Sequence, residues 1–302
     1  MEPRIWLIAG PTASGKSALA LRLARKTGAE IINADALQLY ADLQVLSARP
    51  DVAEMAQAPH HLFGLADGAD GWSVGRWLRA TLQILEDLRT RGRPAVIVGG
   101  TGLYFQALTQ GLAETPPIPP EVRQAVQDRY DAEGEAAVRG QLALSDPAAA
   151  TRIAPGDRLR LSRALEVLVA TGRPISAWQA DTRPALAPDR WRGLILEPSR
   201  ETLYARCDQR FTQMLAQGAG DEVARLTARR LDPALPVMKA VGVRELAAWL
   251  EGRTSLATAT GMACRETRRY AKRQLTWLRN QTADWPRTSS LDPEIQFQAL
   301  PG

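Results

Sequence analysis

Residues 10–17, GPTASGKS, have the spacing G-x-x-x-x-G-K-[ST] of a phosphate-binding loop (P-loop). They follow the apolar residues 5–9, which predict a strand, and lead into residues 16–27, which predict a helix. In such a loop, successive backbone N–H groups and a helix N-terminus bind an anion, usually the phosphates of a nucleotide. The pattern therefore predicts a phosphate site. It leaves open which molecule carries the phosphates, because any pyrophosphate offers the same charge and oxygens.

Two further candidate residues follow predicted strands. Asp35 closes residues 29–35, AEIINAD, and Thr101 follows residues 93–100, RPAVIVGG. Ligands of parallel sheets bind at the carboxyl ends of the strands, so we expect both side chains near the P-loop. The second strand lacks the final Asp with which common ATPases hold Mg²⁺, so Asp35 is instead predicted to be a base that activates a nucleophile. A helix-cap or turn role for Asp35, and a turn hydroxyl for Thr101, are the alternatives.

Residues 263–280, ACRETRRYAKRQLTWLRN, predict a helix with one cationic face. At about 100° per residue, six cations fall within a stripe roughly 140° wide: Arg265, Arg268, Arg269, Lys272, Arg273 and Arg279. Glu266 is the only acidic residue of the segment, which favours contact with a phosphate backbone over an ordinary solvated face. A second basic cluster lies in residues 152–168 and consists of Arg152, Arg158, Arg160 and Arg163.

The elements that must position these residues alternate between strand and helix, which predicts an α/β fold with a P-loop-type parallel sheet flanked by helices. Proline-rich residues 114–121 interrupt this pattern, and the helical periods that follow predict an all-helical insertion. We therefore divide the chain into a first part of the catalytic core (1–114), a helical insertion (115–185), a second part of the core (186–285) and a flexible tail (286–302).

Composition narrows the class of protein. The 302 residues carry a formal charge of +5 and a pI of about 9.5, which is compatible with a nucleic-acid partner. No apolar run predicts a membrane span, the first residues lack the pattern of a signal peptide, and the two cysteines predict free thiols in a cytoplasmic protein. We expect His60 and His61 to pack and hydrogen-bond rather than bind a metal, and the chain to be a monomer.

The motifs together resemble one family. In their order along residues 5–285, the chain is similar to the tRNA dimethylallyltransferases, also called tRNA isopentenyltransferases. The blocks that carry the resemblance are GPTASGKS, NADALQLY, APHHLFG, GGTGLYFQALTQGL, DRLRLSRALEVLVATGRPIS, RCDQRFTQMLAQGAGDEVARL, AVGVREL and RETRRYAKRQLTWLRN. Two positions depart from the family pattern: Ala36 stands where Ser is usual, and Val243 stands where an aromatic residue is frequent.

The resemblance implies a prenyl transfer from dimethylallyl diphosphate to the N6 amine of the adenosine just 3′ of a tRNA anticodon. The P-loop would hold the diphosphate through Gly10, Thr12, Ala13, Ser14, Gly15, Lys16 and Ser17. Ser17 would also bind the cofactor Mg²⁺. Asp35 would deprotonate the amine, Thr101 would contact the bridging oxygen, and Arg210, or alternatively Arg206, would bind the leaving pyrophosphate.

The same resemblance implies that the anticodon stem-loop is bound by Gln38, Arg158, Arg163, Arg265, Arg268, Arg269, Lys272 and Arg273. The target base would have to leave the loop stack to reach the site. Two other functions remain as alternatives. One is a P-loop kinase that binds ATP and phosphorylates a small metabolite or nucleotide. The other is an RNA-binding module without chemistry.

Overall fold

The computed structural model describes residues 4–300 and divides the chain into two compact units. The first unit holds the chain up to Thr109 and from Leu186 onward, and the second holds Gln110–Ala185. The insertion that the proline-rich segment indicates is therefore present, but it begins at Gln110 rather than at 115. Among the described helices, none combines the length and the apolarity that a membrane crossing requires.

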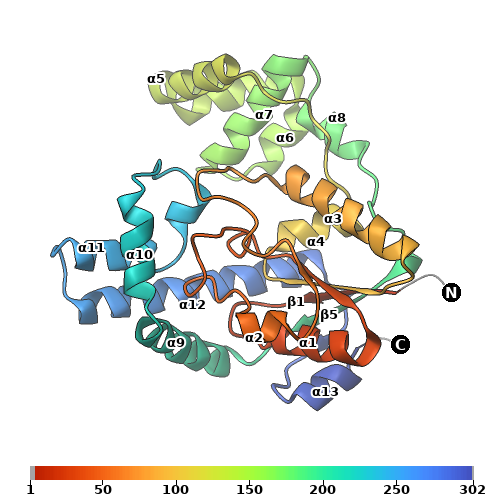
Figure 1. Ribbon diagram of the computed structural model, residues 1–302. Helices are drawn as coiled ribbons and strands as arrows, with labels where there is room; N and C mark the ends of the chain where they lie inside the picture. Colours follow the sequence, from red (N-terminus) through yellow and green to blue (C-terminus); the bar gives the residue numbers. More distant parts are fainter. Residues whose placement is uncertain (1–3, 301–302) are drawn as a thin grey trace. The chain divides into compact units, whose positions relative to one another are not determined.

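The first unit is built on one parallel sheet, as the sequence predicts (Figure 1). Its strand order is β3-β2-β4-β1-β5-β6. The strands are β1 (Ile5–Ala9), β2 (Glu30–Asn33), β3 (His60–His61), β4 (Ala95–Gly99), β5 (Trp191–Leu196) and β6 (Arg287–Thr288). The central strands are buried on both faces and are therefore almost entirely apolar.

The connections between the strands place helices on both faces of the sheet. α1 (Lys16–Thr27) joins β1 to β2 in one direction along the sheet, and α3 (Val74–Thr90) joins β3 to β4 in the opposite direction. Because parallel crossovers are right-handed, α1 and α3 must cover opposite faces, and Figure 1 shows them on opposite sides of the strands. β4 continues into α4 (Gly102–Thr109). The neighbours β1 and β4 thus lead to opposite faces, which makes a switch point between them.

α1 packs through a stripe of small and branched side chains. Leu19, Ala20, Leu23 and Ala24 lie at helical spacing and form one core cluster with side chains of β1, β2, β4 and β5. Trp77 of α3 is completely buried, and its ring stacks on that of Tyr104 at 4.0 Å between centroids. Trp77 is therefore a core residue.

A helical connection leads from β5 to β6. It contains α9 (Arg200–Ala216), α10 (Ala219–Ala228), α11 (Val243–Leu250) and α12 (Leu256–Gln281), the last of which includes the predicted basic helix. α12 packs against α9, α11 and α4 (Figure 1). Shorter elements of this unit are α2 (Val52–Met55), the 3₁₀ turns Pro188–Arg190 and Pro236–Lys239, and α13 (Pro293–Gln298).

The predicted flexible tail is wrong for the described residues 286–300, and residues 301–302 lie outside them. Residues 287–288 pair with β5 as the last strand of the sheet, and Asp292 caps α13 with its carboxylate. The sequence of this segment is polar, but Phe297 packs against the α1 core cluster and lies 4.0 Å from the Lys26 ammonium. Gln296 is 2% exposed. A few long-range apolar contacts therefore order a segment whose local pattern gives no sign of it.

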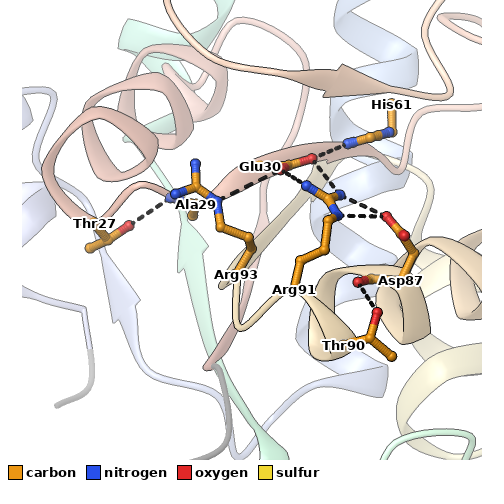
Figure 2. Close-up of polar contacts among 8 residues, drawn as sticks. All are labelled: Thr27, Ala29, Glu30, His61, Asp87, Thr90, Arg91 and Arg93. Atoms are coloured by element: carbon orange, nitrogen blue, oxygen red, sulfur yellow. Dashed lines mark hydrogen bonds and ion pairs between the residues drawn. The ribbon is translucent and has the colours of Figure 1, made fainter.

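An ionic network ties the amino ends of β2 and β4 together (Figure 2). Glu30 is buried at the start of β2, and its carboxylate accepts from Arg91 at 2.7 Å and from His61 Nε2 at 2.7 Å. Arg93 lies at 3.8 Å, and Arg91 also binds Asp87. Hydrogen bonds from Arg91 hold the pKa of Glu30 below its usual value, although burial alone would raise it. His60 and His61 form the edge strand β3, and they hydrogen-bond as expected.

The second unit is entirely helical, as predicted. It contains α5 (Pro120–Ser145), which is kinked at Gly134, with α6 (Pro147–Arg152), α7 (Arg158–Thr171) and α8 (Ile175–Ala180). α5, α6 and α7 share a core cluster of their own. Asp146 is buried, and its carboxylate accepts from the backbone N–H groups of Ala149 and Ser176. This carboxylate caps α6 and joins it to α8, which gives the unit an internal polar anchor.

Candidate active site

The P-loop leaves β1 and winds into α1 through two residues with positive φ. Ala13 has φ 63° and Gly15 has φ 95°, both in the left-handed region. This turn lets α1 begin at Lys16, so the N–H groups of its first turn, including those of Lys16 and Ser17, have no partner within the helix. Gly10 is required by the close approach of Ser14, whose Oγ would lie 2.7 Å from a Cβ at that position. The loop thus has the anion-binding geometry that its sequence predicts.

Lys16 is buried in this loop, and its Nζ donates to the Pro11 carbonyl at 3.2 Å. Burial lowers the pKa of the Lys16 ammonium to about 8, and the charge of Asp35 opposes part of that effect. An anion seated in the loop would favour the charged form. Among the described residues, no ion pair balances the charge of Lys16.

Asp35 lies just beyond the carboxyl end of β2 and is partly exposed. Asn33 fixes its backbone, because Asn33 Oδ1 accepts from the Asp35 N–H at 2.7 Å and Asn33 Nδ2 donates to the Asp35 carbonyl at 2.9 Å. Asp35 Oδ1 accepts from the Leu37 N–H at 3.1 Å. Asp35 therefore does have the turn role that was the alternative to catalysis. That role uses only the oxygen Oδ1 and leaves Oδ2 outside the turn. The charge of Asp35 also raises the pKa of the buried Tyr104 and of the partly buried Tyr270, after the larger effect of burial.

Thr101 lies beside Asp35. Its Oγ1 accepts from the Ala36 N–H at 3.0 Å, and its own N–H donates to the Ala34 carbonyl at 3.1 Å. Because Oγ1 is an acceptor in this contact, its hydroxyl proton remains for a ligand oxygen. A Cβ at Gly99 would overlap the Ala34 carbonyl, so glycine is needed for the two strand ends to approach this closely.

Arg210 reaches the P-loop from α9. Its Nη1 donates to Thr12 Oγ1 at 3.4 Å. Burial lowers the pKa of Arg210, with a smaller effect from Arg206, while the charge of Asp35 acts in the opposite direction. The structure thus brings Arg210 to the phosphate loop, as the preferred assignment expects. Arg206 lies near enough to add positive charge.

Sequence reasoning missed Gln274. This residue of α12 is 6% exposed; its Oε1 accepts from the Thr12 N–H at 2.9 Å, and its Nε2 donates to the Gly100 carbonyl at 2.9 Å. The prediction that the Thr12 N–H contacts a diphosphate is corrected, because that N–H is already donated; Thr12 faces Arg210 through its hydroxyl instead. A signal was available in the sequence: Gln274 is a polar residue about 180° around the helix from the centre of the cationic stripe.

The loop after Asp35 is held from inside. Gln38 is 8% exposed, and its Nε2 donates to the carbonyls of Ser47 and Ala48, both at 2.9 Å. The Gln38 amide nitrogen is therefore not available to RNA, which corrects that part of its predicted role. Glu222 of α10 also anchors this loop, since its carboxylate accepts from three successive N–H groups at 2.6, 2.8 and 2.9 Å, those of Gln44, Val45 and Leu46.

The cationic face of α12 is only partly free. Arg265, Arg269, Lys272 and Arg273 are exposed, and Arg269 binds Glu266 of its own helix. Arg268 is partly buried, and its Nη1 donates to both oxygens of Asp208 at 2.6 Å. Arg279 binds Glu197. The inference of an almost unmixed positive face is corrected, because acidic residues from other elements neutralise part of it.

Three arginines of the second basic cluster are also paired with acidic side chains. Arg158 binds Asp131 at 2.5 Å, Arg160 binds Asp157 at 3.0 Å, and Arg163 lies 3.6 Å from Glu166. The expected basic cluster therefore carries less net charge than its arginine content suggests. The RNA contacts of Arg158 and Arg163 stay predictions. The family departure Val243 is 1% exposed on α11, so this side chain is a core residue rather than a surface contact.

The groups beside the P-loop suit a hard cation. Ser17 offers a partly exposed hydroxyl in the first turn of α1, and Asp35 and Thr101 offer further oxygens. Mg²⁺ prefers oxygen ligands and is often held by few protein groups together with substrate phosphates. Among residues 4–300, no three His, Cys, Asp or Glu side chains gather where they could hold a metal by themselves. The site therefore fits a cation that arrives with a phosphate ligand.

The parallel sheet, with a P-loop at its switch point and Asp35, Thr101 and Arg210 around it, defines an α/β protein of the P-loop class. The family comparison is more specific. The chain belongs to the IPP transferase family: the family described as IPP transferase matches residues 38–281, and the one described as isopentenyl transferase matches residues 3–62. The resemblance seen in the sequence motifs is confirmed.

Individual relatives agree. A tRNA dimethylallyltransferase of Phenylobacterium zucineum (strain HLK1) is 62% identical and covers 99% of this chain and 96% of its own; one of Caulobacter sp. (strain K31) is 56% identical and covers 97% and 94%. Among solved structures, a eukaryotic dimethylallyltransferase acting on tRNA has a TM-score of 0.83 at 28% identity, covering 94% of this chain and 73% of that one. The tRNA isopentenylpyrophosphate transferase of Bacillus halodurans has a TM-score of 0.69 at 30% identity, covering 98% and 94%.

Proposed function

We propose that the protein transfers a dimethylallyl group from dimethylallyl diphosphate to the N6 amine of the adenosine just 3′ of the anticodon in tRNA. The observation that carries the proposal is the meeting of the P-loop with Asp35 and Thr101 at adjoining strand ends. This arrangement offers an anion site and a separate base. The relatives named tRNA dimethylallyltransferase support the same activity.

The donor would bind with its diphosphate in the P-loop. Backbone N–H groups of the first turn of α1 would donate to its oxygens, and Lys16 would balance its charge. Arg210 would contact the diphosphate from the side of Thr12. Buried cations act most strongly on charge that develops during the reaction, so these groups favour the departure of pyrophosphate.

In the transfer, the bond between the allylic carbon and the diphosphate oxygen breaks, and a bond from that carbon to N6 forms. The electron pair of the broken bond leaves with pyrophosphate, and the N6 proton passes to Asp35. The Thr101 hydroxyl would donate a hydrogen bond to the bridging oxygen, as negative charge develops on that oxygen. The turn around Asp35 holds the carboxylate in place, so the amine meets a positioned base.

Mg²⁺ is the cofactor that we propose for this site, with Ser17 as its protein ligand. When bound, the ion would neutralise diphosphate charge. Lys16 and Arg210 would act on the same oxygens from the protein side. The remaining carboxylate oxygen of Asp35 stays free to take the proton.

The exposed cations of α12 are the proposed contact for the tRNA anticodon stem-loop: Arg265, Arg269, Lys272 and Arg273. Exposed lysines and arginines supply the counterion-releasing contacts that dominate RNA affinity. The target adenosine would be extruded from the loop to reach Asp35. We further propose that the protein acts as a monomer in the cytoplasm, where its tRNA substrate is found.

One experiment tests the function directly. The purified protein is incubated with Mg²⁺ and either dimethylallyl diphosphate labelled in its prenyl group or γ-labelled ATP, with and without unmodified tRNA. We expect prenyl label to enter tRNA and no label to transfer from ATP. Transfer from ATP to RNA or to a small molecule, without prenyl transfer, would instead establish the kinase alternative.

A further inference from the structure

Gln274 joins the ends of two neighbouring strands. The P-loop follows β1 and Gly100 follows β4, and these strands are paired with Ala9 opposite Gly99. Both functional groups of the Gln274 amide are used across this junction, one toward Thr12 and one toward Gly100. Its side chain is nearly completely buried, so water does not compete for these bonds. A buried amide with both groups satisfied fixes distances more firmly than an exposed one.

Both contacts of Gln274 lie one step from groups of the proposed reaction. Gln274 accepts a hydrogen bond from the Thr12 N–H, and the Thr12 hydroxyl oxygen accepts one from Arg210. Gly100, whose carbonyl it binds, directly precedes Thr101. One side chain of α12 therefore sets the spacing between the diphosphate loop and the hydroxyl that faces the bridging oxygen.

The glycine turn after β4 makes room for this contact. A Cβ at Gly100 would overlap the Gln274 amide nitrogen, and a Cβ at Gly102 would overlap the Trp277 ring. Gln274 and Trp277 are one helical turn apart on α12, so both face the same turn. The two glycines allow α12 to lie directly on the end of β4. Glycine at these positions is explained by the helix above them rather than by backbone conformation, since neither has a positive φ.

We propose that Gln274 is a positioning residue for the transfer step, which holds the P-loop and Thr101 in register; the inference rests on the proposed function. Gln274 does not touch the reacting atoms and acts through Thr12 and Gly100. Because α12 also carries the exposed cations, the same helix would position the donor site with its buried side and meet RNA with its exposed side. Its loss should affect the donor side of the reaction and leave RNA affinity unchanged.

The first test replaces the amide by a side chain of similar length without hydrogen-bonding groups, Gln274→Met. Misplacing reacting groups by about 1 Å can cost on the order of 100-fold in rate, so we expect kcat to fall by about 10-fold to 100-fold. Pyrophosphate affinity, measured by calorimetry, should fall several-fold, while tRNA affinity stays unchanged. Gln213→Met, at an exposed position of α9, is the matched control and should leave all three values at the wild-type level.

A second variant separates positioning from general support of the fold. In Gln274→Glu, the ionised carboxylate still accepts from Thr12 but cannot donate to the Gly100 carbonyl, whereas the protonated acid can do both. Burial raises the pKa of such a carboxyl group. The activity of Gln274→Glu relative to wild type should therefore rise as the pH is lowered from about 8 to about 6, while that of Gln274→Met stays constant.

The outcomes are distinct. Wild-type kcat and pyrophosphate affinity in folded Gln274→Met would overturn the inference. If that variant does not fold, Gly100→Ala reaches the same contact from the other side and should lower kcat similarly; a folded Gly100→Ala with wild-type kcat would also overturn it. Absence of prenyl transfer by the wild-type protein would refute the proposed function instead. The pyrophosphate measurements would still decide whether Gln274 positions the loop.

Discussion

At the scale of single residues, the site combines a buried cation with a fixed carboxylate. Lys16 lies in the P-loop without an ion-pair partner at contact distance among the described residues, and burial lowers the pKa of its ammonium to about 8. Asp35 is held by its own turn and by Asn33. One residue is therefore suited to receive an anion and the other to accept a proton, and each role can be tested separately.

Donor binding should depend on pH through Lys16. Diphosphate binds the charged ammonium, whose pKa in the free protein is about 8, so affinity should fall as the pH rises above that value. The decrease should approach tenfold per pH unit, and binding above this pKa should take up a proton. Calorimetry with pyrophosphate in buffers of different ionisation enthalpy measures both effects. Lys16→Met should bind weakly at every pH, and a wild-type affinity that does not change up to pH 10 would contradict the assignment.

Asp35→Asn should lower kcat by about 10²–10⁴, the usual contribution of a positioned general base. The amide still accepts from the Leu37 N–H, so the turn and the binding of both substrates should be retained. Single-turnover transfer rates and calorimetric affinities check the two parts. Asp70→Asn, at an exposed position, is the control. A kcat near the wild-type value would leave Asp35 with its turn role only.

At the scale of elements, the sheet has different roles at its two ends. The carboxyl ends of β1, β2 and β4 lead to the P-loop, Asp35 and Thr101, whereas the amino ends of β2 and β4 meet in the ionic network of Glu30. Figure 2 shows Arg91, Arg93 and His61 converging on the buried carboxylate. This network lies at the other end of the strands from the site, so its contribution should be to stability and not to catalysis.

Glu30→Gln should lower the free energy of unfolding by about 1–3 kcal/mol at neutral pH, with kcat unchanged. The arginines left behind are about half exposed and can be solvated, which keeps the cost below that of an isolated buried charge. Because the pKa of Glu30 is lower in the folded protein, its stabilisation is present above the unfolded pKa and is lost as the pH falls through the folded one. Denaturant unfolding at several pH values measures this.

The matched control for Glu30→Gln is Glu86→Gln on α3. Among the described residues, Glu86 forms its ion pair with the neighbouring Arg89 at the surface, so its substitution should change the unfolding free energy much less than Glu30→Gln does. Equal effects of the two substitutions would show that the buried network adds no more than an exposed pair.

At the scale of the whole molecule, the protein has a net charge of +5, but many of its cations already form ion pairs and are not free to contact a partner. The arginines of the second unit named above are paired with acidic side chains, and so are Arg268 and Arg279 of α12. Lys272 and Arg273 remain exposed, with Arg273 lying 5.7 Å from the ring of Tyr270. We therefore distinguish two groups of cations. Those in ion pairs hold parts of the fold together, and those that remain exposed can contact RNA.

Lys272→Ala combined with Arg273→Ala should weaken tRNA binding and lower the slope of log K against log salt by about one to two units, since each phosphate contact contributes roughly 0.7–0.9. Pyrophosphate affinity should be unchanged. Arg89→Ala is the control: it removes a positive charge from α3, outside the proposed RNA contact, and should leave the slope unaltered. Arg268→Ala should change the slope less than the double variant, because its guanidinium already binds Asp208. A folded double variant with the wild-type slope would return α12 to an ordinary solvated face.

The sequence by itself determined what depends on neighbouring residues. Glycine spacing predicted the P-loop, apolar runs predicted β1, β2 and β4, and helical periods predicted α12 and the all-helical insertion, while α1 was predicted directly after the P-loop. These patterns were sufficient because turns, caps and amphipathic faces are local in origin. They also placed Asp35 and Thr101 correctly at strand ends.

Only the tertiary structure decided which groups are free. Gln274 and Thr12 are 262 positions apart, and Arg268 and Asp208 are 60 apart, so no local pattern could show that these groups are already bonded to each other. The order of residues 286–300 likewise depends on Phe297 reaching the α1 core and on residues 287–288 joining β5. A side chain's type limits its chemistry, but its availability depends on partners that only folding brings within hydrogen-bond distance.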